Sequence, residues 1–221
     1  MKPSEYPVDY YSFEKYNTKQ RMLTYWHQID QVLSCQPTSI LEIGVGTGLV
    51  SSYLRHLGID VTTLDINPSL NPDIIGSVLE LESLVHKQFD MVLCARVLHH
   101  LPFEQFPDAI RQIAIVAGKN AVITLPMEDF RLYFMFRYTS SSIRTFSLPI
   151  PLIMKKYFLQ MSGKIHATKY QSGLWKINDF SGVRLQQIQN TIEKYWNILE
   201  QFRIPEDSAH YLLKLQKKQN Q

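Results

Sequence analysis

Short strand-like runs recur between residues 39 and 125. They cover positions 39–43, 60–65, 73–76, 89–94 and 121–125. The run at 60–65 is rich in β-branched residues, which favour strands. The runs at 89–94 and 121–125 are almost continuously apolar, a pattern typical of strands buried on both faces of a parallel sheet. The pattern therefore predicts a sheet of parallel strands.

Residues 17–35 predict an amphipathic helix before the first strand. Their apolar positions recur at helical spacing: Met22, Trp26, Ile29 and Leu33. Asn17, with Gln20 three residues later, resembles a capping box. We expect the helix to begin there.

Helical patterns also separate the strand-like runs. Residues 49–57 predict a helix that Gly58 can end in a left-handed conformation. Further along, one helical face is shared by Ile110, Ile113, Ala114 and Ala117. Strands that alternate with helices in this way predict an α/β fold, a doubly wound sheet with right-handed crossovers.

The regular pattern ends after Pro126 for about fifty residues and resumes near Val183, where another helix is expected. Two extended stretches follow, at 196–203 and 210–215, separated by a turn that contains Pro205. These stretches predict a hairpin that adds an antiparallel edge to the sheet.

The length and apolar content favour one globular domain. The chain has 221 residues, 45% of them hydrophobic. We divide it into an N-terminal helical cap (1–38), a cofactor-binding core (39–126), an insertion or lid over the acceptor site (127–182), and a last helix with the C-terminal hairpin (183–221).

The two cysteines and the apolar runs indicate the compartment. Cys35 and Cys94 lack the spacing of a metal site or a disulfide framework, and no metal is expected. The sequence shows no signal-peptide pattern and no apolar run of the roughly 20 residues that a membrane span needs. We expect a cytoplasmic protein without a transmembrane segment.

The segment 130–178 concentrates positive charge and aromatic rings. It holds eight Lys or Arg residues and no Asp or Glu, whereas the rest of the chain has a net charge of −5. Ten aromatic residues are interleaved with these cations. The segment predicts contact with an anionic, apolar or cyclic small molecule, and Lys155 and Lys156 beside an apolar stretch indicate peripheral membrane contact as a further interpretation.

Two other interpretations of this segment are a packing cap and a nucleic-acid-binding surface. A packing cap whose cations are merely solvated explains it about as well, because aromatic residues at helical spacing are usually core. Nucleic acid is disfavoured, since no recognised RNA-binding or DNA-binding module accompanies the cations.

Three glycines follow the first predicted strand. Gly44, Gly46 and Gly48 alternate with other residues, and Glu42 precedes them by two positions. Missing side chains let the backbone turn sharply and approach a ligand closely, and the next helix offers free amides near its start. This loop is expected to hold a nucleotide-like ligand.

Asp65 ends the second predicted strand, 19 residues beyond Gly46. A carboxylate there can accept hydrogen bonds from both hydroxyls of a ribose. The glycine spacing differs from the G-x-G-x-x-G of dinucleotide folds. A structural turn capped by Asp65 is the plainer alternative, and the order of strand, loop, helix, strand and acid favours the cofactor site.

Residues 40–126 resemble the core of the class I S-adenosylmethionine-dependent methyltransferases. They are closest to the small-molecule branch of type 11 and ubiquinone-biosynthesis-like enzymes, and within it to a bacterial and archaeal subgroup. The matching segments are 41–48, which corresponds to motif I, then 61–68, 73–78, 89–94 and 97–102. The resemblance implies S-adenosylmethionine as cofactor, S-adenosylhomocysteine as product, and a Rossmann-like seven-stranded sheet, mostly parallel with an antiparallel last strand.

The resemblance also implies roles for individual residues. The glycines of motif I would face the methionine and ribose of the cofactor, and Asp65 the ribose hydroxyls. Glu42 would also belong to the cofactor site. Ile66 would cover the adenine, with Ser77 and Val78 at its edge. After the fourth strand, Ala95 and Arg96 would line the floor near the reactive methyl group.

Candidates for catalysis are fewer. His99 and His166 are weak candidates for a general base, and His100 beside the strand end is expected to be structural. Some relatives carry a His-x-Trp-Glu-Ile-like stretch in the insertion. The matching stretch here, residues 173–177, lacks that histidine and glutamate.

These features predict methyl transfer to oxygen or carbon of a small acceptor, anionic or amphiphilic and in some cases lipid-linked. The altered 173–177 stretch motivates a second hypothesis, a non-catalytic S-adenosylmethionine-binding or scaffold protein of the same fold. A nicotinamide-dependent oxidoreductase is a third hypothesis, which the glycine spacing disfavours. The sequence predicts no particular oligomeric state.

Overall fold

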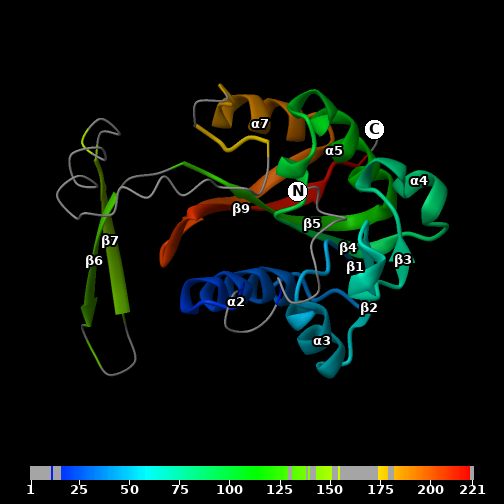
Figure 1. Ribbon diagram of the computed structural model, residues 1–221, viewed down its shortest axis with the longest axis horizontal. Coiled ribbons are helices and arrows are strands. Elements are labelled where there is room, and N and C mark those ends of the chain that lie inside the picture. Colours follow the sequence, from blue (N-terminus) through cyan, green and yellow to red (C-terminus); the bar gives the residue numbers. More distant parts are fainter. Residues whose placement is uncertain are drawn as a thin grey trace.

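A seven-stranded sheet forms the centre of the computed structural model, which describes residues 11, 16–128, 131–137, 139, 143–150, 154, 174–178 and 182–219 (Figure 1). The strand order is β3-β2-β1-β4-β5-β9-β8. The strands are β1 (Ser39–Ile43), β2 (Asp60–Asp65), β3 (Ile74–Ile75), β4 (Phe89–Ala95), β5 (Ala117–Pro126), β8 (Trp196–Ile204) and β9 (Asp207–Lys217).

The sheet is parallel from β3 to β5, and β9 pairs antiparallel with both β5 and β8. The predicted α/β fold, mostly parallel with an antiparallel last strand, is confirmed. Within the hairpin at this end of the sheet, β9 lies inside and β8 forms the edge. Pairing with β5 buries Leu212, Leu213 and Leu215 completely, which explains the inner position.

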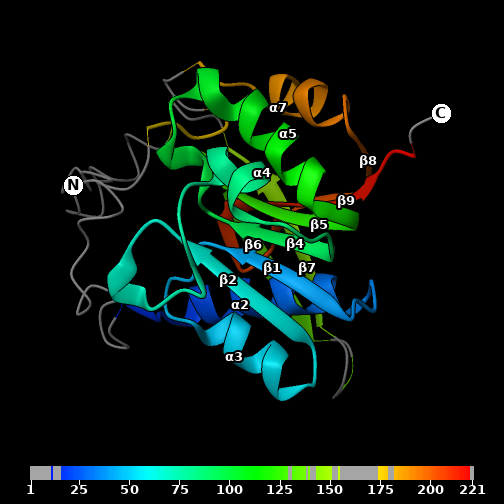
Figure 2. The ribbon, with the colours of Figure 1, turned by 90° about the vertical axis from the view of Figure 1, so that its right-hand side faces the viewer.

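Helices cover both faces of the sheet, as Figure 2 shows. One face carries α2 (Lys19–Leu33) and α3 (Leu49–His56), and the other carries α4 (Leu81–Leu84), α5 (Phe106–Val116) and α7 (Leu185–Ile192). Short 3₁₀ helices connect them: η3 (Pro68–Leu70), η4 (Val78–Glu80), η5 (Leu98–His100) and η6 (Phe103–Gln105). Each face encloses its own apolar cluster.

Helix α2 begins one residue later than predicted, because the cap is Thr18. Its Oγ1 accepts a hydrogen bond from the backbone N–H of Arg21 at 3.3 Å. The buried positions also differ from the expected apolar stripe: Trp26 is 58% exposed, whereas Thr24 and Gln28 are buried. The reason is polar pairing inside the fold, where Gln28 donates to Oγ1 of Thr124 and Thr24 contacts Asp207.

Two further expectations were wrong. Ala117 begins β5 instead of continuing helix α5, which ends at Val116. Part of the segment expected to be irregular forms an antiparallel hairpin of β6 (Arg131–Arg137) and β7 (Ile143–Pro149). Alternating apolar residues have strand periodicity, and the density of aromatics concealed it. In Figure 1 this hairpin stands apart from the seven-stranded sheet.

The structure gives the state of the two cysteines and tests for membrane-spanning helices. Cys35 and Cys94 are both free thiols, as predicted, and Cys94 is buried. Among the described residues, no helix is long and apolar enough to cross a bilayer.

Candidate functional site

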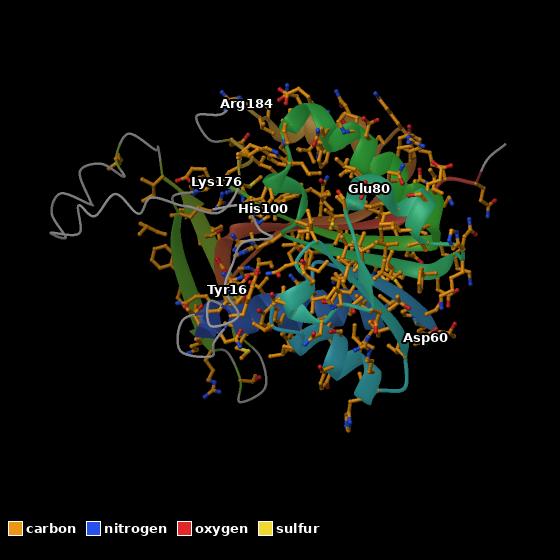
Figure 3. The ribbon with its side chains drawn as sticks, turned by 45° about the vertical axis from the view of Figure 1, so that its right-hand side comes forward. Tyr16, Asp60, Glu80, His100, Lys176 and Arg184 are labelled. Carbon is orange, nitrogen blue, oxygen red and sulfur yellow. The ribbon has the colours of Figure 1, made fainter. Side chains whose placement is uncertain are left out.

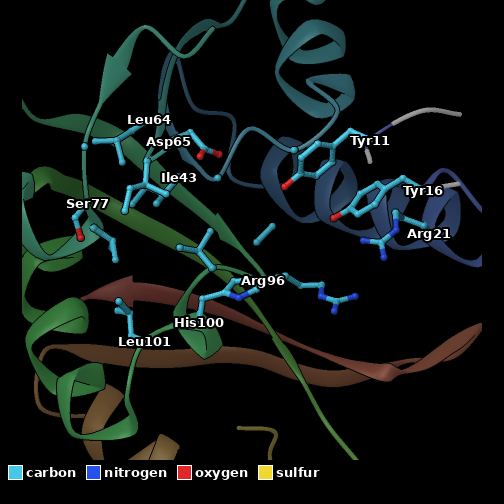
Figure 4. A pocket seen from close by; sticks show the side chains of 17 residues that line it. Tyr11, Tyr16, Arg21, Ile43, Leu64, Asp65, Ser77, Arg96, His100 and Leu101 are labelled. Carbon is cyan, nitrogen blue, oxygen red and sulfur yellow. The ribbon is translucent and has the colours of Figure 1, made fainter. Parts of the chain in front are cut away.

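A pocket opens at the carboxyl ends of β1, β2 and β4, where the strand order reverses between β1 and β4. Open α/β sheets bind ligands at such a switch point. Figure 4 shows side chains converging on it from two sides. Residues of the glycine loop, the strand ends and the turn after β3 form one side, and residues before and within α2 and after β4 form the other.

The glycine loop supplies backbone to the first side. Gly44, Gly46 and Gly48 all have positive φ, at 88°, 55° and 69°, where side chains are strained. A Cβ on Gly44 would collide with Cγ2 of Val97, whereas one on Gly46 would meet nothing within 4 Å. Gly44 and Gly46 line the pocket, so the space above Gly46 is open to a ligand.

Asp65 lines the pocket and is held by backbone amides. Its Oδ2 accepts from the N–H of Val45 at 2.9 Å, and its Oδ1 accepts from the N–H of Asn67 at 2.8 Å. Burial raises the pKa of Asp65, and these amides oppose that shift. A carboxylate has about four acceptor positions, so these amides leave acceptor capacity for a ligand. The capping role and the ligand role therefore coexist.

The remaining residues on this side come from the predicted adenine region. Ile66, Ser77 and Val78 all line the pocket. Ile66 is 48% exposed and Val78 is buried. The hydroxyl of Ser77 accepts from the N–H of Leu79, so it caps the short η4 helix. Ala95, at the end of β4, lines the floor.

Two residues of motif I lie outside the pocket lining. Gly48 caps helix α3. Glu42 is buried in β1 with only 3% exposure, and its burial raises its pKa to about 7. Its Oε2 has no hydrogen-bond partner within the described part of the chain. Glu42 therefore supports the loop from beneath.

The other side of the pocket includes aromatic and cationic residues that the sequence patterns did not indicate. Tyr11, Tyr16 and Arg21 line it (Figure 4). The rings of Tyr11 and Tyr16 meet edge to face at 4.8 Å, and the Arg21 guanidinium carbon lies 3.8 Å from the centroid of the Tyr16 ring. Nε of Arg21 is buried without a hydrogen-bond partner among the described residues. These residues share no sequence motif, and their contacts are evident only in the folded structure.

Arg96 lines the same side and belongs to a chain of polar contacts. Its Nη1 lies 2.7 Å from Nε2 of His210, and Nδ1 of His210 lies 2.8 Å from Oδ2 of Asp207. The sequence patterns indicated Arg96 as a pocket residue. They did not indicate His210 and Asp207, which lie more than a hundred residues later. Their proximity depends on the pairing of β9 with β5.

The histidine candidates differ in placement. His100 lines the pocket, and burial together with the Arg96 charge lowers its pKa to about 4. His99 is 1% exposed and is absent from the pocket lining, and its ring lies 4.1 Å from that of His100. Burial lowers the pKa of His99 well below its usual range. His166 lies outside the described residues.

The described part of the altered stretch packs behind the pocket wall. Nε1 of Trp175 donates to the carbonyl of Leu101 at 2.9 Å, and the ring packs against Phe103 and Phe106. Nζ of Lys176 pairs with Oε2 of Glu128 at 3.1 Å. In these residues the stretch has a structural role.

Comparison with known proteins identifies one matching family model. Residues 41–125 match a family described as a methyltransferase domain. No curated protein sequence matches the chain.

Several solved structures share the fold. The N-methyltransferase NodS from Bradyrhizobium japonicum WM9, in complex with S-adenosylhomocysteine, is 12% identical with a TM-score of 0.59, over 92% of this chain and 90% of its own. Magnesium protoporphyrin IX methyltransferase from Synechocystis PCC 6803, with bound S-adenosylhomocysteine, is 12% identical with a TM-score of 0.60, over 90% and 84%. The small RNA methyltransferase HEN1 is 13% identical with a TM-score of 0.61, over 90% and 25%.

Proposed function

We propose that this chain is an S-adenosylmethionine-dependent methyltransferase that methylates oxygen or carbon of a small acceptor with an anionic or amphiphilic part. The methyltransferase-domain match over residues 41–125 and the shared fold support this proposal. The observation that supports this proposal is that the pocket is lined by two different groups of residues. Glycine backbone and Asp65 form one half, which we call the cofactor half, and Tyr11, Tyr16 and Arg96 belong to the other, the acceptor half.

The residues of the cofactor half fit S-adenosylmethionine. The open space above Gly46 accommodates a ligand against bare backbone. Asp65 keeps acceptor capacity for ribose hydroxyls, and Ile66 and Val78 offer apolar contact to an adenine. When bound, S-adenosylmethionine supplies a methyl carbon made electrophilic by the positively charged sulfur that bears it.

Arg21 is suited to the carboxylate at the amino-acid end of the cofactor. It lies one helical turn before Tyr25, whose hydroxyl is 3.5 Å from Oγ1 of Thr47 in the glycine loop. The unpaired, buried Nε of Arg21 is a donor in need of an acceptor. We therefore assign Arg21 to the cofactor and leave Arg96 for the acceptor.

The chain's own part in the reaction is alignment and exclusion of water. His100 is neutral at neutral pH, because its pKa is about 4, so it can accept a hydrogen bond but is a weak base. His100 therefore does not act as a general base near neutral pH. The proposal therefore favours acceptors whose nucleophile is activated by their own chemistry, such as an ionised oxygen or an electron-rich carbon.

The hairpin of β6 and β7 supports the amphiphilic part of the proposal. One of its faces carries exposed apolar side chains, because Leu132 pairs with Leu148 and Phe134 with Phe146. Residues 131–149 include three arginines and no acid. Apolar side chains with arginines complement an anionic membrane surface, from which a lipid-linked acceptor would reach the pocket.

Vesicle flotation tests this membrane contact. We expect binding to phosphatidylglycerol vesicles and much weaker binding to phosphatidylcholine vesicles. Phe134→Ser should weaken it several-fold, whereas Met135→Ser, on the opposite hairpin face and 62% exposed, should change it less. Equal binding of wild type and Phe134→Ser would remove this part of the proposal.

Calorimetry with S-adenosylmethionine, followed by a search for turnover, tests the function itself. We expect a dissociation constant between about 1 µM and 1 mM and formation of S-adenosylhomocysteine with carboxylated, phosphorylated or lipid-linked acceptors. Binding without turnover on any acceptor would favour the non-catalytic alternative. RNA is a further acceptor class to include, since HEN1 shares the fold.

A further inference from the structure

Arg96 leaves the sheet in an unusual conformation. Its backbone N–H donates to the carbonyl of Thr124 at 2.8 Å, which continues the pairing of β4 with β5, but its φ is +58°. A residue with a Cβ is strained in this region. Strain of this kind is retained where the surrounding structure fixes a side chain for use. Here it accompanies a guanidinium that lines the pocket.

His210 and Arg96 can form their contact in only one protonation state. Arginine is a permanent cation without an acceptor, so the 2.7 Å contact requires a lone pair on Nε2 of His210. The ring is then neutral, with its proton on Nδ1, which faces Oδ2 of Asp207. The carboxylate, 2.8 Å from Nδ1, stabilises the tautomer that carries its proton there.

The surroundings of His210 favour this state. The ring is buried, and Arg96, Arg21 and His99 face it from three different elements, against the single carboxylate of Asp207. Burial and the Arg96 charge lower the pKa of His210. Asp207 is itself fixed by Oγ1 of Thr24, 3.3 Å away on α2.

A neutral partner has a specific consequence for Arg96. A carboxylate in direct contact would fix the guanidinium and also cancel much of its charge. The imidazole fixes one Nη atom without cancelling charge, and the carboxylate lies one residue further back. The contact with His210 thus fixes the direction of the guanidinium without itself adding a negative charge beside it.

We propose that His210 and Asp207 are positioning residues that hold the Arg96 guanidinium in the acceptor half, where it binds a carboxylate or a phosphate of the methyl acceptor. This inference rests on the proposed function, and it names the group of the acceptor that the pocket recognises. Tyr11 and Tyr16 in the same half favour an anion attached to a ring.

Calorimetry with simple probes tests the proposal. Benzoate and phenyl phosphate, with neutral benzyl alcohol as control, are titrated at about pH 7.5 into protein saturated with S-adenosylhomocysteine. We expect wild type to bind one of the anions and not the alcohol, and the tighter anion identifies the acceptor group. Arg96→Met should abolish anion binding, and His210→Ala should weaken it about 10-fold.

His210→Gln separates positioning from mere packing. Its side-chain oxygen can accept from Arg96 without titrating, so anion affinity should return to within about threefold of wild type.

Three results would overturn the proposal: equal anion affinity of wild type and His210→Ala, no anion binding by wild type, or a parallel loss of S-adenosylhomocysteine affinity in Arg96→Met. Failure of wild type to bind S-adenosylhomocysteine would instead count against the proposed function. In that event nitrogen NMR of His210 still decides, because a proton on Nε2 in place of Nδ1 contradicts the contact.

Discussion

The two halves of the pocket are built in opposite ways. The cofactor half uses mainly backbone and one aspartate, from the loop 42–48 and the strand end that pairs beside it, and the cofactor is also assigned Arg21 from α2. The acceptor half uses side chains that are far apart in the sequence: Tyr11, Tyr16, Arg96, His100 and, behind them, His210. A backbone site accepts a ligand common to many proteins, whereas a side-chain site can change its ligand without disturbing the sheet. We therefore expect acceptor specificity to depend on the second half.

The largest effect on cofactor affinity is expected from a substitution of Gly46, in the cofactor half. Gly46→Ala places a methyl group in the open space of the pocket, so S-adenosylmethionine affinity should fall at least about 100-fold, or about 3 kcal/mol. Gly58→Ala is the matched control, because Gly58 also has positive φ and open space but lies after α3, outside the pocket lining. Both should lose about 1 kcal/mol of stability. Equal affinities of the two variants would contradict the assignment.

The next effect concerns Glu42, beneath the cofactor half. Its pKa is about 7 in the fold against 4.5 ordinarily, so the folded state binds more protons between these values, and stability falls as pH rises from about 4.5 to 7. Glu42→Gln should therefore be roughly 2–3 kcal/mol more stable than wild type at about pH 8, and nearly equal at about pH 4.5. Urea unfolding at both pH values measures this. A pH-independent difference would refute it.

A smaller effect separates the two ends of β2. Asp65→Asn should weaken S-adenosylmethionine binding about 10-fold, because one acceptor oxygen becomes a donor group. Asp60 begins the same strand, at the far end of the sheet from Tyr16 and His100 in Figure 3, and pairs with Lys87 on the surface. Asp60→Asn should leave affinity unchanged. Similar losses for both would show that Asp65 acts only on the fold.

The smallest effect tests the wall of the acceptor half. Trp175→Phe removes the donor to the carbonyl of Leu101, a pocket residue, and keeps most of the ring contact with Phe103 and Phe106. We expect a loss of about 1 kcal/mol of stability with unchanged cofactor affinity. Thermal unfolding and calorimetry measure the two quantities. A loss of cofactor affinity would place this wall in the cofactor half.

The same contrast explains what the sequence could predict. Strand, loop and acid of the cofactor half follow one another within about 25 residues, so local spacing predicted Gly44, Gly46 and Asp65 at the pocket. Arg96 and His210 meet only because β9 inserts between β5 and β8. Single-sequence spacing carries no register for such a pairing, and the Asp207–His210 pair was therefore missed.

The buried face of helix α2 differs from the predicted apolar stripe because of polar contacts. Helix α2 hides Thr24 and Gln28 because their partners, Asp207 and Thr124, lie on the sheet, and an apolar stripe cannot reveal polar pairing. Trp26 is exposed for the complementary reason that it points away from that face.

A crystal structure of the protein with S-adenosylhomocysteine tests the division of the pocket most directly. We predict hydrogen bonds from the ribose to Asp65, contact of the amino-acid carboxylate with Arg21, and Arg96 still joined to His210 without touching the ligand. A carboxylate bound by Arg96, or a ribose remote from Asp65, would contradict the account.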